Sequence, residues 1–467
     1  MRSLFANISL AVLLNVLIKP VWVFTEMAVH NAVGNEAWGT YAALLSLAFL
    51  FIVLSDLGIN QYLTKTLASE PERLQELYPN LLALKLVLLL LYPAVMCVVG
   101  LLLGYSALQT GWLAALSLVW GLHQLSGYFR ANFQALQRFR LDSFASILDR
   151  VVLLILVGVL FLTGLSVERF ILLRLLAAGI VAGLRLFCLQ RIYGWIAPKA
   201  DRQSWVRLAR LSLPFALITI LNSIHDKVDQ VMLERIIGPE ATGLYAAAYR
   251  IMDMFNMYLW TTQAIIMARF AFFLKKPDEQ SKVMRFGQVI VAWPMLFVAI
   301  FVFFFGEKLL FIYTKFTPEE IATTSQVLKI LFIASFIHSM WVIYGTLLSV
   351  SNHEHFVNRA VFSGIALNVI LNIILIPTMG PLAAAWSTVA SFGLICILYV
   401  WRTHARTGVR VPYDRMALLL GNALLLAGMF WALGKTALPW WGTTAIAGLV
   451  YLGGSLASGL LSRRLLS

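Results

Sequence analysis

Five basic side chains stand deep inside apolar stretches of the sequence. Lys19, Lys227 and Arg250 fall near the middle of their stretches, and Arg174 and Lys329 lie at a similar depth in two others. An ionisable group inside a membrane span is costly, so its presence there indicates a function. Lysine supplies a point charge and arginine a fork of donors, and both bind phosphate groups well. These residues are therefore our candidates for binding an anionic, phosphate-bearing ligand.

Polar, aromatic and acidic side chains accompany these cations at helical spacing. Tyr249, Asp253 and Asn256 form one stripe, and Glu26 lies seven residues after the first of the basic side chains. Tyr249 and Asn256 would suit a sugar, because ring faces pack on sugars and amides hydrogen-bond to hydroxyls. Glu26, Asp229 and Asp253 are candidates to carry a coupling ion, H⁺ or Na⁺, and a mechanism without coupling is equally allowed.

Local pairing is the alternative interpretation of these charges. Arg250 with Asp253, and Lys227 with Asp226 or Asp229, could neutralise each other on one helix. Such pairs would be structural and would bind no ligand. The lysine at position 19 has no acid within one turn on its own helix, so the alternative does not apply to it.

No arrangement of side chains indicates catalysis or a metal site. The histidines are scattered, no cysteine cluster occurs, and the three cysteines lie apart in apolar stretches. Such thiols are by default buried and inert. The connections between the apolar stretches are too short for a separate catalytic or ATPase domain. We therefore expect no enzyme activity, no metal and no cofactor beyond an unassigned coupling ion.

The composition is that of an all-α polytopic membrane protein. Of the 467 residues 60% are hydrophobic and 12% are charged, and the mean hydropathy is +0.83. Apolar runs of about 20 residues, each long enough to cross a bilayer, recur along the whole chain. They predict fourteen transmembrane helices, at 6–30, 38–60, 80–104, 108–128, 144–164, 167–191, 209–235, 241–272, 285–307, 319–349, 354–378, 381–402, 414–434 and 440–461.

The net charge of +14 follows from the expected membrane topology. Most Lys and Arg residues lie in the even-numbered connections, among them Arg138, Arg140, Lys275 and Lys276. Basic loops stay in the cytoplasm, so both termini are predicted to be cytoplasmic. This distribution explains the positive net charge, so we expect no nucleic-acid partner. Contact with anionic membrane lipids is the second expected role of these loops.

One thirteen-residue segment of the sequence occurs twice in similar form. Residues 33–45 read VGNEAWGTYAALL and residues 237–249 read IGPEATGLYAAAY, with seven of thirteen positions identical at a distance of 204 residues. Gly34 and Gly238 are expected to end a helix with a left-handed φ, and Gly39 and Gly243 to let neighbouring helices approach. Six predicted spans separate the copies, so the halves are parallel repeats related by an axis along the membrane normal.

The repeat predicts how the chain is divided. We expect a six-helix bundle at 1–197, a second at 198–403, and two additional transmembrane helices at 404–467. Proteins of this kind place the substrate site between the halves near mid-membrane. The cations would then converge from both halves on one cavity.

Three segments resemble a known family. DKVDQVMLERIIGPEATGLYAAAYRI (226–251) looks like the seventh-helix signature of the polysaccharide flippases. LNVILNIILIPTMGPLAAAWSTVAS (367–391) is similar to their pattern of an Asn-rich helix followed by Ile-Pro, Gly and a small-residue helix, and GTYAALLSLAFLFIVLSDLGI (39–59) resembles their second helix. These proteins belong to the multidrug, oligosaccharidyl-lipid and polysaccharide exporter superfamily. The resemblance covers nearly the whole chain, and it implies the MATE-like fold of two six-helix bundles.

The resemblance implies a transporter that flips undecaprenyl-diphosphate-linked oligosaccharide, the repeat unit of an O-antigen, capsule or exopolysaccharide, from the inner to the outer leaflet. The substrate would move by alternating access, its diphosphate in a central cationic cavity. Expected partners are this glycan lipid, membrane lipids, and a polysaccharide polymerase or glycosyltransferases, in the bacterial cytoplasmic membrane. Alternatives are a multidrug cation antiporter or a lipid II flippase of the same superfamily and, from another class, a membrane polysaccharide polymerase or ligase. The last two helices resemble those of the lipid II flippases.

Overall fold

The protein was analysed as a computed structural model that describes residues 2–69, 74–135, 139–194, 197–274 and 276–461. Every regular element in these ranges is helical, and none is a strand. By length and apolar character, seven of the described helices could cross a membrane, or eight if the bent helix α7 counts as one. This confirms the all-α polytopic membrane fold. The side chain of Lys19 lies outside the described residues.

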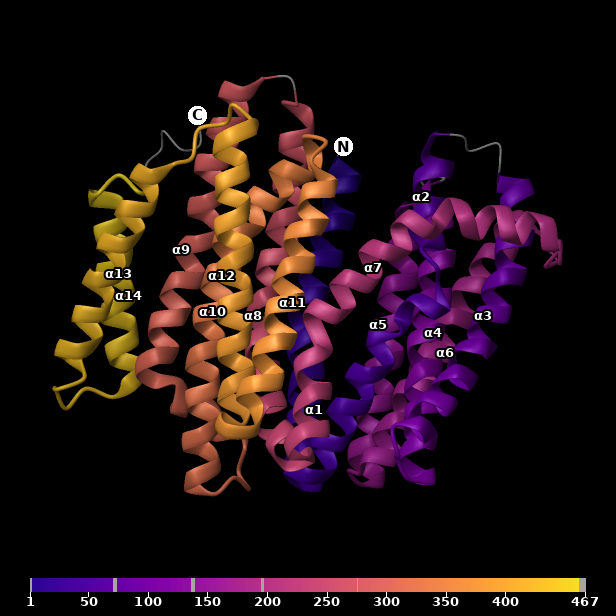
Figure 1. The fold of residues 1–467 in the computed structure, drawn as a ribbon, viewed down its shortest axis with the longest axis horizontal. Coiled ribbons are helices and arrows are strands. Elements are labelled where there is room, and N and C mark those ends of the chain that lie inside the picture. The colour runs from indigo at the N-terminus through magenta and orange to yellow at the C-terminus, as the bar shows by residue number, and fades with distance from the viewer. Residues whose placement is uncertain (1, 70–73, 136–138, 195–196, 275, 462–467) are drawn as a thin grey trace. The chain divides into compact units, whose positions relative to one another are not determined.

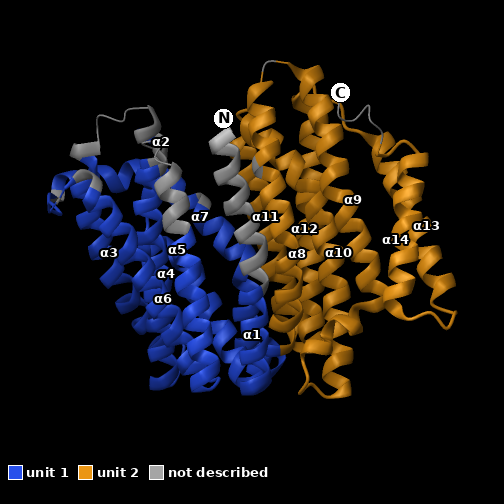
Figure 2. Cartoon of the chain, turned by 180° about the vertical axis from the view of Figure 1, so that it is seen from behind, with its two compact units in different colours: residues 1–243 blue, residues 244–467 orange. Residues whose placement is uncertain are grey.

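The chain forms two compact units, Met1–Gly243 and Leu244–Ser467 (Figure 2). In the first unit, α4 packs against α1, α3 and α6, and α6 also packs against α5 (Figure 1). The first unit contains α1 (Arg2–Leu50), the 3₁₀ turn η1 (Ile52–Ser55), α2 (Ile59–Ser69), α3 (Leu74–Leu102), α4 (Ala107–Ala135), α5 (Phe139–Thr163), α6 (Val167–Tyr193) and α7 (Arg202–Ile237). Because α7 packs against α1 and α2, it belongs to this unit by its contacts. The predicted boundary at 197/198 divides the two sequence repeats, whereas the compact units are defined by packing. The repeat boundary therefore stays a prediction.

The second unit is built around α10, which packs against both α9 and α12, while α11 packs against α12. Its elements are α8 (Pro239–Phe272, shared with the end of the first unit), α9 (Pro277–Leu309), η3 (Leu310–Ile312), α10 (Pro318–Val350), α11 (Glu354–Met379), α12 (Pro381–Arg406), α13 (Tyr413–Leu433) and α14 (Trp440–Ala457). The additional pair α13 and α14 packs against α9. Trp293 of α9 stacks on Tyr451 at 5.0 Å between ring centroids and donates to the hydroxyl of Ser455 at 2.7 Å.

The two copies of the repeated segment, 33–45 and 237–249, have the same backbone conformation at their first glycine. Gly34 has φ 84° and ψ 173°, and Gly238 has φ 102° and ψ 173°. A positive φ with extended ψ is accessible to glycine alone. The positive φ was predicted, although the extended ψ differs from that of the left-handed helix cap. Each glycine breaks one helix and starts the next at the same point of its hairpin.

The two hairpins also touch each other through their second glycines. A Cβ atom on Gly39 would lie 1.7 Å from the carbonyl oxygen of Pro239, and one on Gly243 would lie 2.3 Å from that of Asn35. Residues 35 and 39 correspond to 239 and 243 under the 204-residue shift, so the two contacts are equivalent in the repeat. A reciprocal contact of this kind is the pattern that a local two-fold axis produces. The close approach predicted for these glycines is confirmed.

The second predicted span, 38–60, is broken near its end. The helix α1 ends at Leu50, a 3₁₀ turn follows, and Leu57 and Gly58 have positive φ values of 50° and 78° before α2 begins. Irregular backbone at membrane depth is tolerated where protein buries it. Here a Cβ on Gly58 would lie 2.5 Å from the carbonyl oxygen of Ser212, so the break packs directly on α7.

The break is held by an ion pair that the sequence analysis did not include. Asp56 is 4% exposed and pairs with Lys85 of α3, which is 1% exposed. Lys85 Nζ also lies 3.4 Å from the freed carbonyl oxygen of Ser55, and Asp56 accepts from the backbone N–H of Asn60 at 3.3 Å. The break turns Asp56 inward against α3, so its carboxylate is buried beside Lys85.

Replacing Lys85 with methionine is expected to lower the stability of the protein by about 3–5 kcal/mol, since it leaves the buried Asp56 carboxylate without its cation. The double variant Lys85→Met/Asp56→Asn should recover most of this loss, because the amide can still accept from Asn60. Thermal unfolding in detergent, followed by size-exclusion chromatography, measures both. A single variant as stable as the wild type would show that the ion pair contributes nothing at the break.

Candidate functional site

Two of the predicted site residues, from α1 and α6, form one buried pair in the first unit. Arg174 Nη1 lies 3.3 Å from Glu26 Oε1 and donates to the hydroxyl of Tyr41 at 2.7 Å. The two charged side chains are 10% and 4% exposed. Arg174 was predicted to bind substrate and Glu26 to carry a coupling ion, and the structure places them in contact.

Aromatic rings surround the guanidinium. Its Cζ lies 5.3 Å from the ring centroid of Trp22 and 5.9 Å from that of Phe170. Such cation–π contacts are strongest where water is excluded, as at this pair. Trp38 extends the group, because it contacts the rings of both Tyr41 and Phe170. We call Arg174, Glu26, Tyr41, Trp22 and Phe170 the Arg174 cluster.

The Arg174 cluster leaves part of the guanidinium available. Among the described residues, both polar contacts of Arg174 are made by Nη1. Arginine carries five N–H donors in a planar fork, so Nη2 and Nε remain as donors. An anion with two oxygens could bind them side by side while Tyr41 holds the other edge. The cluster can therefore bind a phosphate group or, if Glu26 becomes protonated, exchange one anionic partner for another.

A polar face of α7 lies against the second half of α1 in the same unit. Ser46 of α1 donates to Gln230 Oε1 at 2.6 Å, and Ser223 donates to the carbonyl oxygen of Leu50 at 3.2 Å. Lys227 falls between Ser223 and Gln230 at helical spacing and is half-buried. The predicted site residue Asp229 is 7% exposed.

Arg250 of the second unit makes a local ion pair. Its Nη1 lies 3.9 Å from Asp253 Oδ2, three residues along α8, and the side chains are 25% and 15% exposed. This is the pairing expected under the structural alternative. The distance is long for an ion pair between groups of this exposure, so its contribution to stability is small.

The other predicted residues of the second unit lie on two helices. Asn256 is 5% exposed and accepts a hydrogen bond from Ser335 of α10, while the ring of Tyr249 lies 5.8 Å from that of Tyr245. Lys329 of α10 is half-buried, and its Cε lies 3.8 Å from where a Cβ on Gly306 would stand. The Tyr249 contact lies within α8, and those of Asn256 and Lys329 join α8 to α10 and α10 to α9. The convergence of cations from both halves on one cavity stays a prediction.

Some interacting residues were missed from the sequence. Tyr41 is 1% exposed, and its hydroxyl accepts a hydrogen bond from Arg174. Asp149 pairs with Arg185 of α6, which is 8% exposed and donates to Ser126 at 2.8 Å. The rule that selected Lys19, a charge inside an apolar run, would also have selected Lys85 and Arg185.

Comparisons with known proteins agree on the family. Residues 4–270, more than half of the chain, match the family described as polysaccharide biosynthesis protein. Among curated proteins, the "Probable low-salt glycan biosynthesis flippase Agl15" of Haloferax volcanii is 22% identical over 227 residues. That match covers 47% of this chain and 48% of the relative, so the chain spans about half the length of the curated relative it matches.

The fold is found in solved transporters of low sequence identity. The "Lipid II flippase MurJ, inward closed conformation" has a TM-score of 0.79 at 13% identity and covers 98% of this chain and 100% of its own. An inward-facing multidrug resistance MATE family transporter of the MOP superfamily has a TM-score of 0.65 at 12% identity, over 82% of this chain and 94% of its own. These likenesses concern the fold alone. The chain therefore belongs to the polysaccharide biosynthesis protein family and has the helical fold found in the lipid II flippase and the multidrug exporters.

Proposed function

We propose that the protein flips a glycan linked to a polyprenyl diphosphate, of the undecaprenyl type, across the bacterial cytoplasmic membrane. Membership in the polysaccharide biosynthesis family and the likeness to a glycan biosynthesis flippase support a lipid-linked glycan as substrate. The observation that carries the proposal is the Arg174 cluster, because it holds a buried guanidinium with free donors in a multi-pass membrane protein. A neutral substrate would not require that charge, which is costly to bury.

In this mechanism, Arg174 binds the diphosphate through Nη2 and Nε while Glu26 and Tyr41 keep Nη1 in place. Lys19, Lys227, Arg250 and Lys329 supply further positive charge as the substrate crosses. The sugar meets polar and aromatic side chains such as Tyr249 and Asn256, and the polyprenyl tail stays in the lipid. The two repeat halves open in turn to either side around a site near mid-membrane. Uptake of H⁺ or Na⁺ by Glu26, Asp229 or Asp253 would couple this movement to an ion gradient.

The substrate class can be tested in proteoliposomes. Purified protein is reconstituted with a fluorescent glycan on a polyprenyl diphosphate, and a membrane-impermeant quencher reports the fraction in the outer leaflet over time. We expect equilibration between leaflets with wild-type protein and not with empty vesicles. A matched polyprenyl monophosphate glycan tests the role of the diphosphate and should move more slowly. Export of cationic drugs without movement of the glycan lipid would support the multidrug antiporter instead.

Replacing Lys19 with alanine is expected to slow this flipping by about 10- to 100-fold, the effect of losing one charge-assisted contact of about 1.5–3 kcal/mol. Lys19→Arg keeps the positive charge and should retain more activity. Protein abundance in the membrane, measured by immunoblot, is expected to stay at the wild-type level in both variants. Normal flipping by Lys19→Ala would remove Lys19 from the proposed site.

A further inference from the structure

The first part of α7 differs from the apolar spans around it. Residues Gln203–Leu213 form an amphipathic helix that meets Phe215–Ile237 at an angle of 55°. Figure 1 shows this part of α7 running across the ends of neighbouring helices of the first unit. Asp201 caps its start by accepting from the backbone N–H groups of Gln203 and Ser204. We call Gln203–Leu213 the α7 arm.

The inner face of the α7 arm is fixed to the core of its unit. Leu208 is 5% exposed and belongs to a buried cluster with residues of α2, α3, α4 and α6, against which Trp205 also packs. Ser212 is fully buried and contacts the break after η1. One face of the arm is thus packed against the core of the first unit.

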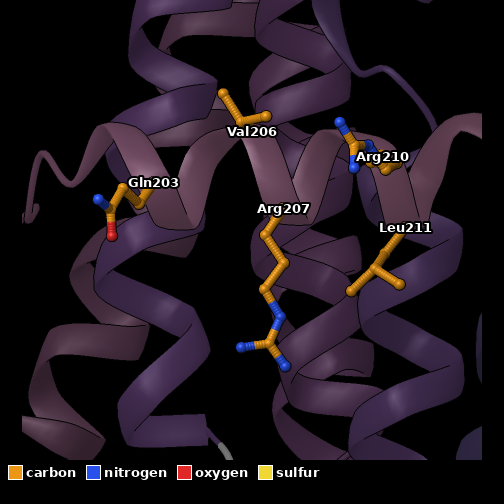
Figure 3. Close-up of a pocket in the computed structure, with 5 residues that line it drawn as sticks. All are labelled: Gln203, Val206, Arg207, Arg210 and Leu211. Carbon is orange, nitrogen blue, oxygen red and sulfur yellow. The ribbon is translucent and has the colours of Figure 1, made fainter.

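The outer face of the α7 arm contains a pocket of about 450 Å³ lined by Gln203, Val206, Arg207, Arg210 and Leu211. Figure 3 shows these side chains along the arm, with Arg207 between Gln203 and Leu211. Both arginines are exposed, and neither forms an ion pair within the described part of the chain. None of these five lining residues is acidic. Two guanidinium groups therefore share one pocket with an amide and two apolar side chains.

Large apolar side chains are exposed on the arm beside this pocket. Val206 is 55% exposed, Leu211 44% and Leu213 61%. Helices that combine exposed apolar residues with arginines lie in the membrane interface, with the apolar side chains among the acyl chains and the charges at the headgroups. The predicted topology places the arm at the cytoplasmic side, where anionic lipids attract basic residues.

We propose that the pocket on the α7 arm binds the headgroup phosphate of an anionic phospholipid. Arg207 and Arg210 would bind the phosphate oxygens through their forked donors. Gln203 can hydrogen-bond to the polar part of the headgroup, and Val206 and Leu211 contact the first methylene groups of the acyl chains. A soluble protein partner does not fit this surface, because the exposed apolar side chains of the α7 arm would face the membrane and not the cytoplasm. The site is separate from the Arg174 cluster and does not depend on the substrate of the transporter.

Lipid binding can be measured by native mass spectrometry of the full-length protein, titrated with phosphatidylglycerol or phosphatidylcholine. For Arg207→Gln/Arg210→Gln we expect a loss of affinity for phosphatidylglycerol of about 10-fold or more, since charge-assisted contacts disappear. Phosphatidylcholine binding should stay unchanged. Arg207→Lys/Arg210→Lys retains the charge without the forks and should fall between the wild type and the glutamine variant.

Arg359→Gln/Arg406→Gln is the matched control, because it removes two exposed arginines elsewhere on the chain. It should bind phosphatidylglycerol like the wild type. An equal loss in this control would mean that overall charge attracts the lipid and would overturn the proposal. Unchanged binding by the Arg207/Arg210 glutamine variant would also overturn it. Inorganic phosphate at about 10 mM, a concentration that would fill a weak free-anion site, tests the remaining alternative. If it displaced the bound phosphatidylglycerol, the pocket would be a site for a soluble anion and the proposal would be overturned. Glycan flipping is scored separately, so failure here leaves the proposed function untouched.

Discussion

Arg174→Ala is expected to reduce flipping of the polyprenyl-diphosphate glycan by at least about 100-fold, because two forked contacts of about 1.5–3 kcal/mol each would be lost. The same change removes one cationic partner of the 3%-exposed Glu26, so it should also destabilise the protein. The quencher assay gives the flipping rate, and thermal unfolding gives the stability.

The double variant Arg174→Ala/Glu26→Gln separates these two effects. It also replaces the Glu26 carboxylate with a neutral amide, so the protein should regain most of its thermal stability while flipping stays at the low rate. If the double variant flips the substrate like the wild type, the Arg174 cluster is structural and does not bind the diphosphate.

The single variant Glu26→Gln tests the coupling role of this carboxylate. If Glu26 carries the coupling proton, flipping by this variant should no longer respond to an imposed pH gradient. A response equal to that of the wild type would exclude Glu26 as the coupling site.

A methyl group at the hairpin contact is expected to have the second large effect. In Gly39→Ala the new Cβ would stand 1.7 Å from the carbonyl oxygen of Pro239, which is backbone and has no rotamer to change. Overpacking of ordinary side chains costs about 1–3 kcal/mol, and we expect this contact to cost at least the upper end of that range. Gly243→Ala should behave alike, because its Cβ would stand 2.3 Å from the carbonyl oxygen of Asn35.

Gly158→Ala in α5 is the control for this prediction, since nothing lies within 4 Å of its Cβ position. That variant should unfold at the wild-type temperature or slightly above it, because alanine favours helix over glycine by about 1 kcal/mol. Fluorescence-detected size-exclusion chromatography after heating compares the three. If Gly39→Ala were as stable as Gly158→Ala, the hairpins would not touch as the structure shows.

The sequence predicted the elements well, because each has a local signal. Membrane-spanning segments are recognised by their hydropathy, and the duplicated hairpins are recognised by their sequence identity, which includes Gly34 and Gly238. The break after Leu50 has a weaker signal, in the Asp-Leu-Gly that follows an apolar run. It was missed because apolar periodicity continues through the residues on either side.

The contacts of the site could not be predicted in the same way. Depth along a helix selected both Glu26 and Arg174, but they are 148 residues apart, on α1 and α6. Their contact depends on how the helices pack, and a single sequence contains no distance between helices. By contrast, the pairing of Arg250 with Asp253 was foreseen as an alternative, because three residues along one helix fix the geometry.

The reciprocal contact of the two hairpins has a consequence for the origin of the chain. When one surface patch meets its own copy across a two-fold axis, the interface is isologous, as in a homodimer. Residues 35 and 39 meet 239 and 243 in this manner. A half-length ancestor could have paired with a second copy of itself through this glycine contact, before gene fusion joined the copies. Asn35 and Pro239 differ between the two copies, while Gly39 and Gly243, which admit no larger residue at the contact, are the same in both.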